Sequence, residues 1–100
     1  MVEPPDRPDL FVVVRILGVL RESPGGLRKT PLQQAAGVNY TVFSRYLTLL
    51  ADRGLVRLDR DETTELVVIT ERGVESLGFL LRGIERVVRP SEGGRTDKNR

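Results

Sequence analysis

The order of hydrophobic and polar positions in the first half of the chain predicts a short helix over residues 30–36. Thr30 can cap this helix at its N-terminus, and Pro31 suits the first helical position because its missing N–H is not needed there. Gly37 is placed to end the helix. The predicted helix is therefore short and closes in a tight turn.

A second helix, about residues 40–53, follows this turn at once. Asn39 can cap it, and Gly54 suits the left-handed position that commonly closes a helix. Its apolar side chains recur at the spacing of one helix face, at Phe43, Leu47 and Leu50. The pattern predicts a helix-turn-helix, an arrangement in which the second helix can lie in the major groove of DNA.

The opposite face of this second helix is polar and carries no acidic residue before Asp52. An arginine there can bond guanine O6 and N7, and hydroxyl groups can bond phosphates or base edges. An ordinary solvated surface is the alternative interpretation. Tyr46 shares the side of the apolar stripe, which predicts packing. The candidate DNA contacts are Tyr40, Thr41, Ser44, Arg45 and Thr48, with Arg45 the strongest single candidate.

Beyond Gly54 the apolar positions change to a period of about 2, which predicts strands at residues 55–60 and 65–70. Residues 61–64 supply the turn, so residues 55–69 are expected to form a hairpin, or wing, after the recognition helix. Its Arg57 and Arg60 either contact phosphates or pair across the strands with Glu62 or Glu65. Residues 27–29 are expected to pair with the hairpin edge, which leaves Arg28 and Lys29 beside the groove-facing side.

The apolar residues of the first and last helices cover a wider part of the helix surface than the core of one small domain can bury. Residues 10–20 include three consecutive valines, yet the length of the run favours helix over strand, with Asp6 or Arg7 near its cap. Thr70 can cap the last helix, which Pro90 ends. A helix that is apolar nearly all round needs cover on more than one side, which predicts a homodimer. The candidate interface residues are Phe11, Val14, Leu77, Leu80, Leu81, Ile84 and Val88.

The chain therefore divides into a flexible leader, a folded domain and a disordered polar tail, at residues 1–8, 9–89 and 90–100. Residues 1–88 hold twelve Lys and Arg against twelve Asp and Glu, and residues 89–100 hold four against two. The domain itself is neutral, so DNA binding requires that its charges be segregated onto different faces.

The absence of Cys and His from the sequence narrows the possible functions. It excludes disulfides, zinc sites, thiol nucleophiles and histidine acid–base catalysis, and no glycine-rich phosphate loop occurs. We therefore expect no enzyme activity, no metal and no cofactor. Neither a signal peptide nor a membrane-length apolar run is present in the 100 residues, so we expect a soluble cytoplasmic protein associated with the nucleoid.

The order of helices and hairpin, together with residues 47–56 and 69–73, resembles the winged-helix transcriptional regulators of bacteria and archaea. The chain is most similar to small archaeal dimeric winged-helix DNA-binding proteins, which carry Tyr-Leu before Leu-x-x-x-Gly-Leu. These motifs correspond here to Tyr46-Leu47 and to residues 50–55. The resemblance implies an α+β, mainly α, winged helix-turn-helix fold. Some of those proteins dimerise through a long C-terminal coiled coil, but the last helix here is too short, which favours a compact dimer.

Three functions remain open at this point. The first is a dimeric transcriptional regulator that binds specific double-stranded DNA. The second is an architectural chromatin protein with little sequence preference. The third is a winged helix that serves only as a protein–protein interaction module, for which the neutral domain is the best argument.

Overall fold

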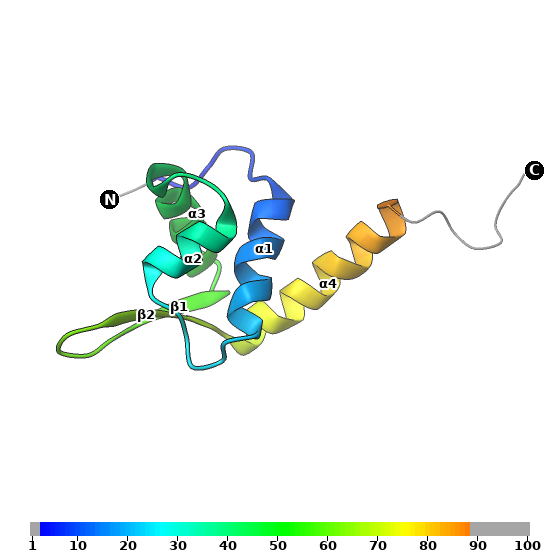
Figure 1. Cartoon of the computed structure of the whole chain (residues 1–100). Helices are drawn as coiled ribbons and strands as arrows, with labels where there is room; N and C mark the ends of the chain where they lie inside the picture. The colour runs from blue at the N-terminus through cyan, green and yellow to red at the C-terminus, as the bar shows by residue number, and fades with distance from the viewer. Residues whose placement is uncertain (1–2, 89–100) are drawn as a thin grey trace, which may run out of the picture.

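The computed structural model describes residues 3–88 and shows four helices and a two-stranded antiparallel sheet within that range (Figure 1). The predicted fold class, a mainly helical α+β winged helix, is confirmed. The predicted disordered tail, residues 90–100, lies outside the described residues. In chain order the elements are α1 (Leu10–Arg21), α2 (Lys29–Ala36), α3 (Tyr40–Asp52), β1 (Val56–Arg60), β2 (Glu65–Ile69) and α4 (Glu71–Val88).

Residues Leu10–Arg21 form a helix, as predicted over the alternative of a strand. Its cap is Asp9, however, and not Asp6 or Arg7 as predicted. The Asp9 carboxylate accepts from the Phe11 N–H at 2.8 Å, because it stands directly before the first helical turn, where backbone N–H groups lack helical partners. The cap therefore lies closer to the apolar run than the sequence pattern suggested.

The start of α2 also differs from the prediction. The helix begins at Lys29, and the residue in the cap position is Arg28, which makes no side-chain cap bond. Thr30 is thus already helical, and Pro31 occupies a later position of the first turn, where a missing N–H is still tolerated. The predicted end is confirmed, because Gly37 closes the helix with a left-handed φ of 74°.

The first three helices enclose the core, to which the sheet and α4 add one side each. Tyr46 is buried, as predicted, and its hydroxyl oxygen accepts from the Asp9 N–H at 2.7 Å. This bond ties the start of α1 to the middle of α3. The largest fully buried side chains are Phe43, Ile16, Leu17, Leu20, Leu32, Leu50, Leu77 and Val67.

The hairpin has the predicted strands and turn, with Val56 opposite Ile69 and Arg60 opposite Glu65. Leu27 adds a short bridge to its edge, because its N–H and carbonyl bond the backbone of Val67 at 3.0 and 2.8 Å. The predicted pairing of this segment with the hairpin is therefore confirmed for Leu27. As a result the wing is fixed to the segment that leads directly into α2.

The start of α4 is held against the end of α3. Thr70 caps α4 as predicted: its hydroxyl accepts from the Gly73 N–H at 3.0 Å and donates to the Gly54 carbonyl at 2.6 Å. The first half of α4 packs on the core through Leu77, whereas its second half extends away from the other helices (Figure 1). One side of this extended half is therefore uncovered.

Candidate nucleic-acid interface

The candidate recognition helix presents its polar residues on one face, which we call the polar face: Tyr40, Thr41, Ser44, Arg45 and Thr48. The predicted cap is present, since the Asn39 carboxamide oxygen accepts from the Val42 N–H at 2.8 Å. Phe43, Leu47 and Leu50 are buried, which turns the polar face outward. Tyr40 is 53% exposed and Thr41 is also exposed, whereas the other three are partly exposed.

Two members of the polar face already make contacts within the chain. The Thr48 hydroxyl donates to the Ser44 carbonyl at 3.1 Å, which leaves its lone pairs and methyl group for other contacts. The Arg45 Nε donates to the Glu3 carbonyl at 3.4 Å, so the segment before α1 passes close to this guanidinium. Both contacts are long and partly exposed to solvent, so neither blocks the face.

A shallow groove lies between α3 and the wing. Lys29, Tyr40, Ser44 and Thr48 line it, together with Leu58 from β1. Four of the predicted contacts therefore meet in one hollow. Sequence reasoning missed Leu58, which is 43% exposed, although the strand alternation places it on the same side of β1 as Val56 and Arg60.

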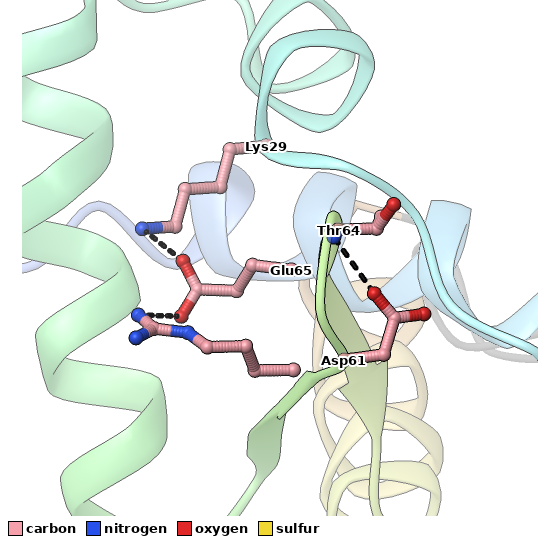
Figure 2. A network of polar contacts seen from close by, with 5 residues as sticks. Lys29, Asp61, Thr64 and Glu65 are labelled. Atoms are coloured by element: carbon pink, nitrogen blue, oxygen red, sulfur yellow. Dashed lines mark hydrogen bonds and ion pairs between the residues drawn. The ribbon is translucent and has the colours of Figure 1, made fainter.

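The cations of the wing are paired. Arg60 Nη2 lies 2.9 Å from Glu65 Oε2, so of the two roles predicted for Arg60 the structure shows the cross-strand pair. Arg57 instead pairs with Asp59 on its own strand at 2.9 Å, and not with either predicted glutamate. Lys29 Nζ lies 3.0 Å from Glu65 Oε1, and Figure 2 shows this pair. Hydrogen bonds from Lys29, and secondly from Arg60, lower the pKa of Glu65.

A second groove lies between the start of α2 and the hairpin turn, and Arg28, Lys29, Thr64 and Glu65 are among its lining residues. Arg28 is exposed here, as expected for a residue beside the groove-facing side. Across the groove Asp61 closes the turn, and backbone hydrogen bonds from Thr63 and Thr64 lower its pKa. Each basic residue on this side therefore lies near a carboxylate.

An apolar groove between α1 and α4 forms a separate surface, which we call the apolar face: Leu10, Phe11, Phe79, Leu80, Ile84 and Val87. Phe11, Phe79 and Val87 are 54%, 71% and 85% exposed. Phe11, Leu80 and Ile84 were predicted here, whereas Leu10, Phe79 and Val87 were missed. Phe79 could have been found from its spacing to Gly83 and Val87, which repeats every four residues along one side of α4.

The predicted interface set needs one correction. Leu77 is fully buried in the core of this chain, so it cannot line an outer surface. Val14 is partly buried against the same core, and Leu81 is 36% exposed outside the groove. Val88 ends α4, and its side chain lies outside the described part of the chain.

Residues 3–88 contain neither a cluster of metal-ligand side chains nor a helix suited to span a membrane. In this range no three His, Cys, Asp or Glu side chains converge in a way that could hold a metal ion. No helix of the described residues is both long and apolar enough to cross a membrane.

Comparison with known proteins agrees with the fold. Among solved structures, the chain is similar to F93 from STIV, described as a winged-helix DNA-binding protein, with a TM-score of 0.67 and 15% identity over 83% of this chain and 94% of that one. It is also similar to a MarR-family transcriptional regulator from Silicibacter pomeroyi, with a TM-score of 0.61 and 26% identity over 83% and 60% of the two chains.

A third similar structure is the PcaV transcriptional regulator from Streptomyces coelicolor in complex with its natural ligand. The TM-score is 0.62 and the identity 21%, over 88% of this chain and 65% of that one. The present chain thus spans about two thirds or less of both regulators. No curated protein sequence gives a significant match. A family model for the winged helix-turn-helix matches residues 7–88, and the chain therefore belongs to the winged helix-turn-helix family.

Proposed function

We propose that this chain is a dimeric transcriptional regulator that binds double-stranded DNA. In the complex, α3 enters the major groove and the wing, residues 55–69, lies on the backbone or in the minor groove. The proposal rests on one observation: the polar face of α3 carries hydroxyls, an aromatic ring and a guanidinium, and it opens into a groove that leads to the wing. The similarity to MarR-family regulators supports a role in transcription.

Base reading is assigned to the middle of the polar face. Arg45 can bond a guanine bidentately, and Ser44 and Thr48 can bond base edges or meet a thymine methyl group. Tyr40 and Thr41, at the start of the helix, are suited to phosphates. Phosphate contacts would also come from Arg28 and Lys29, which line the second groove, and from Arg57 and Arg60 on β1.

Two chains would associate through the apolar face. Its exposed phenylalanines and valine have no cover within the described residues, and a second copy of the same face offers matching apolar surface. A symmetric dimer of helix-turn-helix domains reads two half-sites about 34–36 Å apart. Dimerisation therefore determines the operator spacing that α3 can read. A cytoplasmic, nucleoid-associated location follows from this function.

The test is a duplex titration at several salt concentrations with the DNA upstream of the gene and with a random duplex. Arg45→Ala is expected to weaken binding to the upstream DNA by about 1–3 kcal/mol, because a bidentate base contact is lost. Arg82→Ala, on the exposed side of α4, makes the same charge change away from α3 and serves as the control.

Three results would contradict parts of this proposal. Equal loss of affinity in Arg45→Ala and Arg82→Ala would exclude base reading by Arg45. Equal affinity of the wild type for both duplexes would favour an architectural protein. No binding to either duplex at low salt would mean that the domain serves a protein partner.

A further inference from the structure

Glu65 holds two of the cations on which the proposed interface depends. Its Oε1 accepts from Lys29 Nζ at 3.0 Å, and its Oε2 accepts from Arg60 Nη2 at 2.9 Å. Lys29 begins α2 and Arg60 ends β1, so one carboxylate on β2 gathers cations from two other elements (Figure 2). Both carboxylate oxygens therefore have a cationic partner before any DNA arrives.

The position of this carboxylate matters for DNA. Lys29 lines both the groove beside α3 and the groove between α2 and the hairpin turn, and Glu65 lines the second. Lys29 therefore lies between the polar face of α3 and the hairpin turn, where a DNA backbone in contact with both would meet it. A phosphate that reaches Lys29 there meets an ammonium group that a carboxylate already neutralises.

We propose that Glu65 is an internal competitor of DNA phosphates: its carboxylate retains Lys29 and Arg60 and so limits the affinity and the salt dependence of DNA binding. The inference rests on the proposed function and deepens it. Salt dependence arises because each cation that neutralises a phosphate releases condensed counterions. A cation that stays paired with Glu65 neutralises less phosphate charge, and a cation that leaves Glu65 must first break an ion pair.

A purely structural role for Glu65 is a weaker explanation. The Arg60 side chain is 74% exposed, and ion pairs of exposed side chains contribute little to stability. The Lys29 and Glu65 side chains are 33% and 24% exposed, so their pair is only partly solvated. The segment before α2 is already joined to the wing by the two backbone bonds between Leu27 and Val67. Replacement of the carboxylate should therefore leave the fold intact while it frees both cations.

The experiment compares wild type with Glu65→Gln in fluorescence-anisotropy titrations of a random duplex at several salt concentrations. Glu65→Gln keeps the shape of the side chain and removes its charge. We expect it to bind the duplex about threefold to tenfold more tightly at low salt, and the slope of log K against log salt to steepen by about 1–2. The thermal unfolding midpoint of each variant confirms that it is folded.

Glu62→Gln is the matched control. Glu62 lies in the same hairpin, is exposed and forms no ion pair within the described residues, so its loss makes the same charge change without freeing a cation. It should leave the salt slope at the wild-type value. In a Lys29→Ala, Arg60→Ala background, Glu65→Gln should no longer steepen the slope, because the cations it would free are absent.

Two outcomes would overturn the inference alone. One is a wild type that binds duplex DNA while Glu65→Gln behaves like Glu62→Gln. The other is weaker binding by Glu65→Gln, which would mean that the carboxylate positions the cations for DNA. If neither the wild type nor Glu65→Gln bound any duplex at low salt, the proposed function would fail and this inference with it.

Discussion

The polar face of α3 and the apolar face between α1 and α4 differ in whether the residues at or beside them already have interaction partners within the same chain. Around the polar face, Lys29 and Arg60 already have a carboxylate partner. On the apolar face, Phe79 and Val87 are mostly exposed and have no such partner. The polar side can remain in water without penalty, whereas burial of the apolar side would gain about 25 cal/mol per Å².

This difference separates two contributions to the proposed function. The apolar face would supply the free energy of dimerisation. The polar face would supply base selection, and the neighbouring cations would supply a phosphate affinity that Glu65 limits. Substitutions on the polar face should therefore leave self-association unchanged, whereas substitutions on the apolar face should weaken DNA binding only through loss of the dimer. The following changes test this separation.

The largest effect is expected for Phe79→Lys. Phe79 is exposed in the monomer, and a lysine there stands four residues after Glu75, a spacing that favours the helix. A dimer, however, would have to bury the new charge. We expect self-association to weaken by about 2 kcal/mol or more, and DNA affinity to fall about 100-fold because the two half-sites are no longer linked.

Sedimentation velocity across a concentration series measures the first effect, and DNA titration measures the second. Val74→Lys is the control, because it makes the same charge change in the first turn of α4, outside the apolar groove. A wild type that stays monomeric at the concentrations at which it binds DNA would contradict the assignment of the apolar face to a dimer.

A smaller effect is expected for Gly73→Ala, which tests the junction between the two faces. A Cβ at Gly73 would collide with the Leu55 carbonyl oxygen, and would come within 2.7 Å of the Ile69 side chain. The backbone must shift, so we expect the free energy of unfolding to fall by about 1–3 kcal/mol despite the higher helix propensity of alanine. Urea denaturation measures the change.

Gly78→Ala in the same helix is the matched control. Its Cβ would make only an ordinary contact at 3.5 Å with the end of the flexible Arg82 side chain. Alanine should therefore raise stability by up to about 1 kcal/mol through helix propensity. Equal stability of Gly73→Ala and the wild type would show that the contact of α4 with Leu55 is looser than the structure indicates.

The sequence predicts α3 well because three local signals agree there. Asn39 caps the helix, Gly54 follows its end with a left-handed φ of 73°, and the apolar stripe between them is buried as predicted. The start of α2 was misplaced because Arg28 provides no side-chain cap that the sequence could reveal, and because Pro31 is compatible with any position of a first turn.

Contacts between elements that are distant in sequence were harder to predict. The sequence predicts Glu65 as one of two glutamates that could pair with Arg60, as the alternative to a phosphate contact. Its pairing with Lys29 depends on the bridge from Leu27 to the wing, which joins residues distant in sequence. Leu77 was assigned to the dimer because the stripe on α4 does not reveal which apolar side meets the chain's own core. Phe79 was missed for the same reason, since the packing of α4 against α1 determines which side stays exposed.

The smallest effect is expected at the hairpin turn in acid. The Asp61 carboxylate accepts from the N–H groups of Thr63 and Thr64 at 3.0 and 2.7 Å, and these bonds hold its pKa below the ordinary value of 3.8. A lowered folded pKa means that the carboxylate stabilises the turn fully above pH 3.8, and that this stabilisation is lost as the pH falls through the folded pKa. The amide resonances of Thr63 and Thr64 should therefore shift with a midpoint below pH 3.8 in the wild type.

In Asp61→Asn these resonances should not titrate in that range, whereas in Glu62→Gln they should behave as in the wild type. The apolar face contains no titratable side chain among the residues that line its groove, so the methyl resonances of Leu80 and Ile84 should stay unchanged over the same pH range. A midpoint at or above pH 3.8 would show that the two backbone bonds to Asp61 are not maintained in solution. Parallel shifts on the apolar face would instead show that the turn and the α1–α4 surface respond to acid as one unit.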